Sequence, residues 1–565
     1  MAVHRKMGAS RKLTDLNSFR RDFLKLAGTG VAGAAVEALA IPLSRAQHAS
    51  IPEKAIDAGF SVRGFGAKGD GTTLDTSAIN KAIEAASRNG GGTVRFPPGV
   101  YLSYSIRLKS NVILSLDSGA TILAASVPVE GRSTGAYDAA EPNEPWDRYQ
   151  DYGHSHWHNS LIWGEGIHNV GIVGTGLIWG KGLSRGASEV PLAETPGMGN
   201  KAIALKNCHN IVLRDISILE GGHFALLATG VDNLTIDNLL IDTNRDGIDV
   251  DCCRNVRISN CSVNSPWDDA ICPKSSFALG YARSTENVTI TNCYVTGAYE
   301  MGSILDGTWK RWSKDKAGQS KVVPYFPEEF NGSIKLGTES NGGFKNITIS
   351  NCVFDGSKGF ALESSDGAVI EGLILSGITM RDCTNTPLFL RLGSRMRGPA
   401  GIPVGSLRGV TLSDIVSYNS VTRLGGGGII AGIPGHDIED VKIHDVYLEH
   451  GGGGTEAMAA LNPTEAAEDN PYPDPDMFGD IPASGFFLRH VKNIELTNVE
   501  IAMREADARP VFRMDHVDGA DLFHIKTPRA HKAPVFALRD VRDFRVAASR
   551  GVGDEYIESV AQKDI

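Results

Sequence analysis

The stretches HNIVLRDISIL (209–219), VDNLTIDNLLI (231–241) and RNVRISNCSV (254–263) share one pattern. In each, an asparagine precedes alternating β-branched residues, and a second Asn or Asp introduces another short apolar run. Such runs, bounded by turn-forming residues, are typical of short β-strands. The pattern returns at 286–295, 345–354, 408–417, 439–448 and 492–501.

The spacing of the pattern predicts how the strands are arranged. Asn210, Asn233 and Asn255 follow one another at offsets of 23 and 22 residues. Repeats of this length are typical of one turn of a parallel β-helix, in which equivalent residues stack about 4.8 Å apart. A β-sandwich is disfavoured, because it has hairpin turns and no fixed repeat. We therefore predict an all-β, single-stranded, right-handed parallel β-helix over residues 47–565.

Helix and loop signals complete the predicted fold. LDTSAINKAIEAASRNGGG (74–92) has helical apolar spacing, with Asp75 as a possible N-cap and glycines from Gly90 onward. We expect this N-terminal α-helix to cap the open end of the coil and protect its first strand edges. The polar stretch 308–329 and the Pro/Asp-rich stretch 462–480 are predicted as long loops.

The charge distribution limits the possible partners. The formal net charge is −10; the first 46 residues carry eight Lys/Arg against three Asp/Glu, which leaves −15 for the rest. This excess of negative charge argues against nucleic acid or an anionic membrane as a partner. No run of about 20 uncharged apolar residues follows the N-terminus, so we expect a mature protein without a membrane span.

The N-terminal segment resembles a twin-arginine export signal. Arg20 and Arg21 precede a weakly hydrophobic Gly/Ala-rich stretch, and small residues suit cleavage after Ala46. The resemblance implies that residues 1–46 are a signal peptide read by the twin-arginine machinery, and that the protein is periplasmic or extracellular.

The eight cysteines do not require disulfides, because that route exports folded proteins. Cys261, Cys293 and Cys352 each follow an asparagine in equivalent strings, and their spacing matches no zinc site. We expect them to form a buried ladder of reduced thiols.

Three aspartates form the candidate hydrolytic centre. Asp246 and Asp268 are 22 residues apart, one turn of the coil, and Asp269 is adjacent. In a regular strand Asp268 and Asp269 would point to opposite sides, so both can serve one site only at a strand end or bend. Carboxylates this close raise at least one pKa, which leaves one group protonated and others ionised. Glycoside hydrolysis needs this combination, with acid and base about 6.5 to 9.5 Å apart for inversion.

These residues lie in a string that resembles glycoside hydrolase family 28, the polygalacturonases and rhamnogalacturonan hydrolases. NRDGIDVDCCRNVRISNCSVNSPWDDAICPKS (244–275) is similar to its Asn-Thr-Asp-Gly, Asp-Asp and Lys-Ser elements, and residues 64–102 are similar to the opening of pectin-active β-helices. The resemblance spans most of 59–380. It implies a uronic-acid-containing polysaccharide or oligosaccharide as substrate, no metal or cofactor, Asp268 as general acid, and Asp246 and Asp269 as the residues that hold and activate water.

Two departures from the family pattern bear on the substrate. Glu300 stands near the place of the family's histidine, and Ser333 replaces the arginine of its Arg-Ile-Lys element while Lys335 is kept. Lysine offers a point charge rather than a planar fork for a uronate carboxylate. We therefore expect Lys335 and Glu300 to contact the substrate. We also expect Arg391, together with Arg395 and Arg397, to supply cations in place of the lost arginine.

Alternative interpretations remain for single residues. Asp, Asn and Gly are common in β-helix turns, so Asp249 and Asp251 are read as turn or support residues. Two interpretations remain for Glu339 and Glu363: their carboxylates either face the cleft or accept hydrogen bonds from turn amides. A structural role is the default for His223. His154, His156 and His158 alternate as neighbours on one face of a strand would, which allows metal binding, but the Trp- and Tyr-rich loop around them more naturally lines a sugar site or covers the barrel.

Two other functions suit a β-helix. A polysaccharide lyase would abstract a proton beside a uronate carboxyl with Lys or Arg, usually helped by Ca²⁺. A non-catalytic carbohydrate-binding or adhesive β-helix would not need the aspartates.

Overall fold

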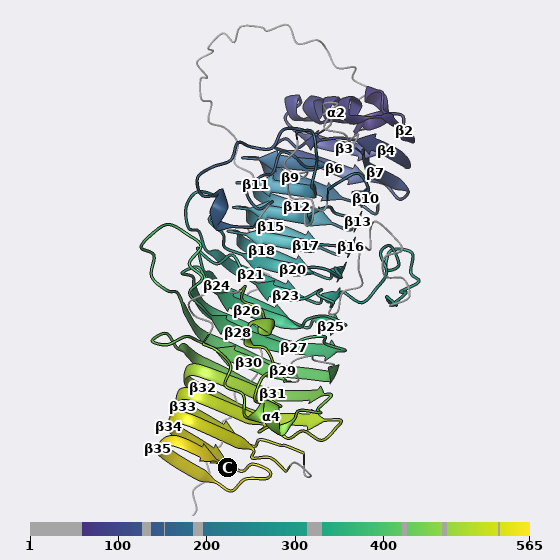
Figure 1. Cartoon of the computed structure of the whole chain (residues 1–565). Coiled ribbons are helices and arrows are strands. Elements are labelled where there is room, and N and C mark those ends of the chain that lie inside the picture. The colour runs from purple at the N-terminus through teal and green to yellow at the C-terminus, as the bar shows by residue number, and fades with distance from the viewer. Residues whose placement is uncertain are drawn as a thin grey trace, which may run out of the picture. The chain divides into compact units, whose positions relative to one another are not determined.

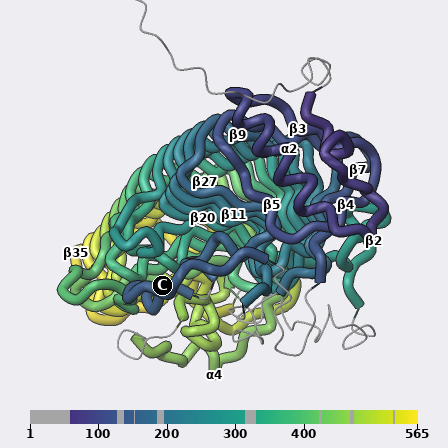
Figure 2. The backbone as a smooth tube through the Cα atoms, turned by 90° about the horizontal axis from the view of Figure 1, so that it is seen from above, coloured from purple at the N-terminus to yellow at the C-terminus, as the bar shows by residue number. Residues whose placement is uncertain are grey.

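Three ladders of parallel strands run along the described part of the chain (Figures 1 and 2). We call them the site ladder, the asparagine ladder and the third ladder. The site ladder holds β5 (Ile106–Arg107), β8 (Ile162–Glu165), β11 (Lys201–Lys206), β14 (Phe224–Thr229), β17 (Asp246–Asp251), β20 (Ile271–Lys274), β23 (Ile334–Leu336), β26 (Phe360–Ser364), β28 (Leu388–Leu392) and β30 (Gly428–Ala431). The asparagine ladder holds β1 (Phe60–Ser61), β3 (Gly92–Phe96), β6 (Val112–Leu116), β9 (His168–Val173), β12 (His209–Arg214), β15 (Asp232–Asp237), β18 (Arg254–Ser259), β21 (Thr285–Thr291) and β24 (Phe344–Ser350). The third ladder holds β2 (Asp70–Leu74), β4 (Gly99–Ser103), β7 (Ala120–Ala124), β10 (Leu177–Trp179), β13 (Ser217–Leu219), β16 (Leu240–Asp242), β19 (Ser262–Asn264), β22 (Tyr294–Thr296) and β25 (Val353–Asp355).

Longer strands continue the coil toward the C-terminus. β27 pairs with both β24 and β25, and β32 pairs with both β30 and β31, so single strands there bend across two ladders. Among the named strands, every pairing is parallel except that of β34 with β35. The long strands are β27 (Val369–Arg381), β29 (Ser406–Ser420), β31 (Ile438–His450), β32 (Phe486–Met503), β33 (Phe512–Phe523), β34 (Phe536–Ala547) and β35 (Glu555–Asp564).

The computed structural model describes residues 59–126, 137–151, 153–184, 196–313, 330–420, 426–465, 472–528 and 532–565. The predicted signal peptide, residues 1–46, lies outside them, as does most of the predicted loop 308–329. Of the second predicted loop, 462–480, the structure describes 462–465 and 472–480, and the latter part contains the 3-10 helix η6 (Pro475–Phe478). A short helix, α4 (Glu456–Ala459), precedes it.

Strand registers confirm the period read from the sequence. Phe224 pairs with Asp246, and Asp232 pairs with Arg254, each 22 residues further along the chain. The inward side chains of successive turns therefore stack on one another. Ile248 of β17 pairs with Ile271 of β20, and both are fully buried. The core is one continuous column of such aliphatic layers.

Asparagine side chains stack along the outside of the coil. Asn210, Asn233 and Asn255 have φ angles of 57°, 55° and 58°. Asparagine tolerates this left-handed conformation better than other side chains with a Cβ. The amide of Asn233 donates to Asn210 Oδ1 at 3.0 Å, and that of Asn255 donates to Asn233 Oδ1 at 3.3 Å. One residue type thus supplies both the bend and a side-chain contact between turns.

All eight cysteines are free and buried. Cys261, Cys293 and Cys352 directly precede β19, β22 and β25, which pair in sequence. The expected ladder of reduced thiols is confirmed.

The predicted helix is present as α2 (Thr76–Arg88), and it buries Ile79, Ala82 and Ile83. Asp75 precedes it, but its carboxylate accepts hydrogen bonds from the backbone N–H groups of Lys68 and Gly69 rather than from the helix. Figure 1 shows α2 beside the first strands of the coil. Its role as a cap stays a prediction. None of the helices in the described ranges has the length and apolar character needed to span a membrane.

Candidate active site

Three aspartates from neighbouring turns meet in one pocket. Asp246 opens β17, whereas Asp268 and Asp269 lie in the bend before β20, the next strand of the site ladder. One carboxylate oxygen of each lies within 4.8 Å of the others. The backbone N–H of Asp269 donates to Asp246 Oδ1 and Asp268 Oδ1, both at 3.2 Å. The predicted meeting of these residues at a bend is confirmed; their catalytic roles stay predictions.

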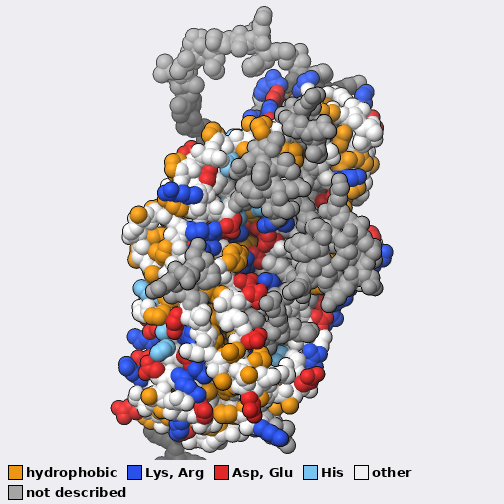
Figure 3. Space-filling model, viewed as in Figure 1, with side chains coloured by type: hydrophobic (Ala, Val, Ile, Leu, Met, Phe, Trp, Pro, Cys, Tyr) orange, Lys and Arg blue, Asp and Glu red, His pale blue; other side chains and the backbone are white. Residues whose placement is uncertain are grey.

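Charged side chains dominate the pocket, whose volume is about 220 Å³. In Figure 3, acidic and basic side chains lie together near mid-height of the visible face, the height at which Figure 1 labels β17 and β20. The lining residues are Asp151, His154, His223, Arg245, Asp246, Asp268, Asp269, Lys274, Lys335 and Tyr472.

Two cations bind the paired aspartates individually. Arg245 Nη2 lies 2.8 Å from Asp268 Oδ2, and Lys335 Nζ lies 2.5 Å from Asp269 Oδ2. Ser333 Oγ donates to Asp269 Oδ1 at 2.5 Å. The residue that replaces the family's arginine therefore orients Asp269, while Lys335 neutralises its charge.

Lys274 connects Asp246 to a deeper layer of the site. Its Nζ lies 3.8 Å from Asp246 Oδ2, 3.5 Å from Asp249 Oδ2 and 3.3 Å from Glu339 Oε2. His154 Nε2 lies 3.6 Å from the same oxygen of Asp249. All five residues are buried, so their charges interact strongly through the protein interior.

The aspartates differ in proton affinity. Burial, reinforced by the negative charges of Asp249 and Asp268, raises the pKa of Asp246 well above its usual value. Burial alone would also raise the pKa of Asp268, but Arg245 and Lys335 lower it below the usual value. A hydrogen bond with Asp246 adds to this lowering. Asp246 therefore holds a proton more readily than Asp268 does.

A second layer of charges supports the pocket. Arg397 donates to Asp151 Oδ1 at 2.6 Å and to Glu339 Oε1 at 2.7 Å. Against the effect of burial, Lys274, His154 and Arg397 hold the pKa of Glu339 well below its usual value. This network ties the segment around Asp151 to the site ladder.

The predicted substrate-binding residues divide into one inside the pocket and two outside. Lys335 lines the pocket, but Glu300 and Arg391 do not. Arg391 is buried and donates to the carbonyl oxygens of Ala431 and Gly432, at 3.3 and 2.9 Å. Its expected role as a replacement cation is therefore corrected: it binds backbone within the fold.

Glu300 lies in the turn after β22. Its backbone N–H donates to the carbonyl oxygen of Lys310 at 2.7 Å, and its own carbonyl accepts from Ser303 at 3.0 Å. The long excursion between β22 and β23 begins there, and residues 314–329 of it lie outside the described ranges. The contact of Glu300 with substrate stays a prediction.

Several pocket residues were not predicted. Arg245 and Lys274 stood within the string that resembles the family, and their basic charge beside paired acids was the available signal. Tyr472 and His223 had no such signal, because Tyr472 comes from a distant loop and His223 is an isolated histidine.

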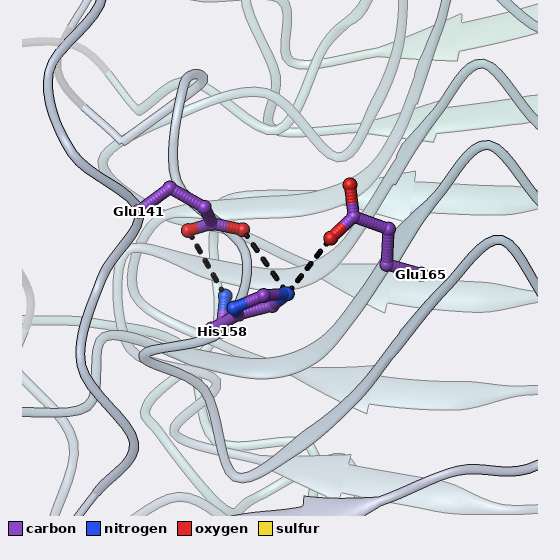
Figure 4. Close-up of side chains that lie close together, drawn as sticks. All are labelled: Glu141, His158 and Glu165. Carbon is purple, nitrogen blue, oxygen red and sulfur yellow. Dashed lines mark hydrogen bonds and ion pairs between the residues drawn. The ribbon is translucent and has the colours of Figure 1, made fainter.

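The three alternating histidines do not form one site. Residues 153–160 are not a strand, and each ring has its own partners. His154 faces Asp249, and His156 lies 2.9 Å from Asn143 Oδ1. His158 Nε2 lies 2.9 Å from Glu165 Oε2 and 3.5 Å from Glu141 Oε1 (Figure 4).

Among the described residues, three clusters have the geometry to hold a metal ion, but a cation already lies beside each: Glu141, His158 and Glu165; His154, Asp246 and Asp249; and Asp246, Asp268 and Asp269. The cluster in Figure 4 includes an ion pair of 3.1 Å between Lys206 and Glu165. In the pocket, Arg245, Lys274 and Lys335 each face one of the aspartates. This positive charge weakens the attraction of these carboxylates for a metal ion.

Comparisons with known proteins agree with this architecture. The family described as "Rhamnogalacturonase A/epimerase, pectate lyase-like" matches residues 59–299. An exo-poly-α-D-galacturonosidase of Dickeya chrysanthemi is 26% identical over 40% of this chain and 43% of its own. The plasmin and fibronectin-binding protein A of Streptococcus pneumoniae is 26% identical over 53% of this chain and 39% of its own. The chain thus spans less than half the length of these two relatives.

A solved structure supports the fold over most of the chain. The family 28 exopolygalacturonase of Yersinia enterocolitica superposes with a TM-score of 0.60 at 18% identity, covering 82% of this chain and 77% of that one. The fold and the carboxylate pocket define a parallel β-helix protein of the pectin-lyase fold. Within that class, the chain is similar to glycoside hydrolase family 28.

Proposed function

We propose that the chain is a glycoside hydrolase that cleaves pectic, uronic-acid-containing polysaccharides or oligosaccharides. The observation that carries the proposal is the meeting of Asp246, Asp268 and Asp269 within 4.8 Å in a pocket lined by three cations. Unequal proton affinities supply both an acid and a base near neutral pH. Similarity to the Dickeya chrysanthemi exo-poly-α-D-galacturonosidase supports a galacturonate substrate.

The exposed fractions of the three aspartate side chains indicate which of them acts as the general acid. The side chain of Asp268 is 21% exposed, against 4% for Asp246 and 1% for Asp269. Asp268 is therefore the aspartate that a glycosidic oxygen can reach, and we assign it the role of general acid. Asp269, paired with Lys335 at 2.5 Å, and Asp246 then hold and activate water.

Inversion rests on the resemblance to the family. The nearest oxygens of the three aspartates are closer than the separation of about 6.5 to 9.5 Å expected of an inverting pair. Product stereochemistry therefore has to be measured.

Product analysis by NMR tests the proposal. The protein would be incubated with polygalacturonate, rhamnogalacturonan and short oligogalacturonates, and the first-formed anomer recorded. Saturated products of inverted configuration are expected. Unsaturated products that absorb in the ultraviolet and disappear with chelator would identify a lyase, whereas binding without any product would identify a carbohydrate-binding β-helix.

We also propose export through the twin-arginine machinery, from the Arg20–Arg21 pair and the Gly/Ala-rich stretch after it. Replacement of both arginines by lysine should retain the protein in the cytoplasm, as measured by cell fractionation. Unchanged export would contradict this proposal.

A further inference from the structure

Arg245 is the most accessible cation of the pocket. Its side chain is 22% exposed, compared with 6% for Lys274 and 10% for Lys335. It immediately precedes Asp246, so the start of β17 directs it into the same pocket. A ligand that enters the pocket therefore meets this guanidinium before it meets either ammonium group.

The two lysines are committed to carboxylates of the protein. Lys335 lies 2.5 Å from Asp269, and Lys274 lies between Asp246, Asp249 and Glu339. Removing either lysine from these contacts would leave a buried carboxylate without its cation, which is costly. Neither lysine is therefore a good partner for the carboxylate of a sugar.

Arginine has the shape for that task. Its planar guanidinium presents several N–H donors and binds carboxylates through two parallel hydrogen bonds. In the free protein, Arg245 Nη2 binds Asp268 Oδ2 at 2.8 Å, so its partner is the residue that has to deliver the proton. A carboxylate on the sugar would compete for the same group.

We propose that Arg245 binds the carboxylate of a uronate sugar, and that this change of partner allows Asp268 to take up a proton shared within the cluster of three aspartates. The inference rests on the proposed hydrolase function and extends it, because binding of the sugar's own carboxylate favours protonation of the general acid. A neutral sugar of the same shape would bind without drawing Arg245 away from Asp268.

The charges around Asp268 favour this transfer. Asp246 and Asp269 place carboxylates within 4.8 Å of it, whereas Arg245, Lys335 and Lys274 hold its pKa below the usual value. Since the two lysines stay on their own carboxylates, weakening the Arg245 contact leaves repulsion dominant, and repulsion favours protonation of Asp268.

The protons balance over one cycle. The proton moves within the aspartate cluster to Asp268, and from Asp268 to the leaving glycosidic oxygen as the bond to the anomeric carbon breaks. Water adds to that carbon, and its proton returns to the cluster. Asp268 then pairs with Arg245 again when the product leaves.

The test compares kcat/KM on an oligogalacturonate and on its methyl ester of equal length. R245Q should lose on the order of 10- to 100-fold on the acid and little on the ester, which removes the preference for the acid. R245K should recover part of the loss, because lysine keeps the charge without the fork. Arg214, an exposed residue 3.4 Å from its neighbour Asp215, provides the matched control R214Q.

The pH profile gives a second readout. On the ester, R245Q should retain activity to higher pH than the wild type, because Asp268 no longer faces the guanidinium and keeps its proton longer. The inference would be overturned if R245Q lost kcat/KM equally on the acid and the ester, or if the basic limb of its pH–activity profile on the ester matched that of the wild type.

Failure of the proposed function would be recognised separately. In that case the wild type cleaves neither sugar, and the proton transfer is refuted with it. Calorimetric titration of the same two oligosaccharides would still decide the Arg245 contact, since R245Q should weaken binding of the acid alone.

Discussion

The asparagine ladder and the carboxylate site follow the same stacking rule with opposite energetic results. On the asparagine ladder, residues 22 or 23 positions apart bring amide groups together, and each amide donates to the one before it. On the site ladder, the same spacing brings Asp246 beside Asp268, and like charges repel. Stacking stabilises the coil in the first region, whereas in the second the surrounding cations have to offset the repulsion.

Removing the acids should give the largest effect. Asp268→Asn should lower kcat by about 10³- to 10⁴-fold, because the amide cannot donate the proton to the leaving oxygen. The measurement is steady-state hydrolysis of an oligogalacturonate, with circular dichroism as the check on folding. A well-folded D268N protein with near wild-type kcat would refute the assignment of Asp268.

Removing the cation that pairs with Asp269 should lower the free energy of unfolding. Lys335→Met leaves Asp269 buried without its ion pair, and we expect a loss of about 3–5 kcal/mol in the free energy of unfolding. Urea titration measures it. The double variant K335M/D269N serves as the control, because it removes both charges and should regain most of the loss. A loss in the double variant as large as in K335M would indicate packing rather than charge.

A break in the asparagine ladder should cost less. Asn233→Ala removes two amide hydrogen bonds and replaces asparagine, which tolerates a φ of 55°, with alanine, which tolerates it less well. We expect a loss of about 2 kcal/mol in the free energy of unfolding. Asn233→Gly keeps the backbone conformation and should lose about half as much. Equal losses for the two variants would show that backbone conformation contributes nothing at this position.

The smallest effect concerns pH. Because the pKa of Asp246 is raised on folding, the folded protein binds this proton more tightly than the unfolded chain, and the contribution of Asp246 to stability declines as the pH rises above the usual value for Asp. Asp246→Asn should therefore be modestly more stable than the wild type near neutral pH, and the difference should shrink as the pH falls toward about 4. Urea titrations at the two pH values measure it. A difference that grows on acidification would contradict the raised pKa.

Periodic features were predictable from the sequence, because a fixed repeat determines which residues stack. This applies to the strands, the thiol ladder and the meeting of Asp246 with Asp268, whereas Lys335 was predicted from the resemblance to the family's Arg-Ile-Lys element. The position of Arg391 was not predictable in the same way. It lies in a regular strand, but its guanidinium reaches backbone carbonyls and lies 5.4 Å from the ring centre of Phe478, in a loop with no repeat.

Loop residues of the pocket escaped prediction for the same reason. The hydroxyl of Tyr472 is within hydrogen-bond distance of Lys335 Nζ, 3.2 Å, although 137 positions separate them in the chain. Nothing in the local sequence around Tyr472 specifies that contact. Arg245 differs, because it occupies a periodic position and could have been noticed as a basic residue beside a predicted acid.

The free, buried cysteines have a consequence for the conditions under which the protein folds. With no cystine bridge to form, the fold depends on neither an oxidant nor an isomerase, and its stability is independent of the redox poise of its surroundings. Burial also keeps these thiols out of reach of other molecules and so protects them from thiol–disulfide exchange. The same chain can therefore mature in a reducing compartment and persist in an oxidising one.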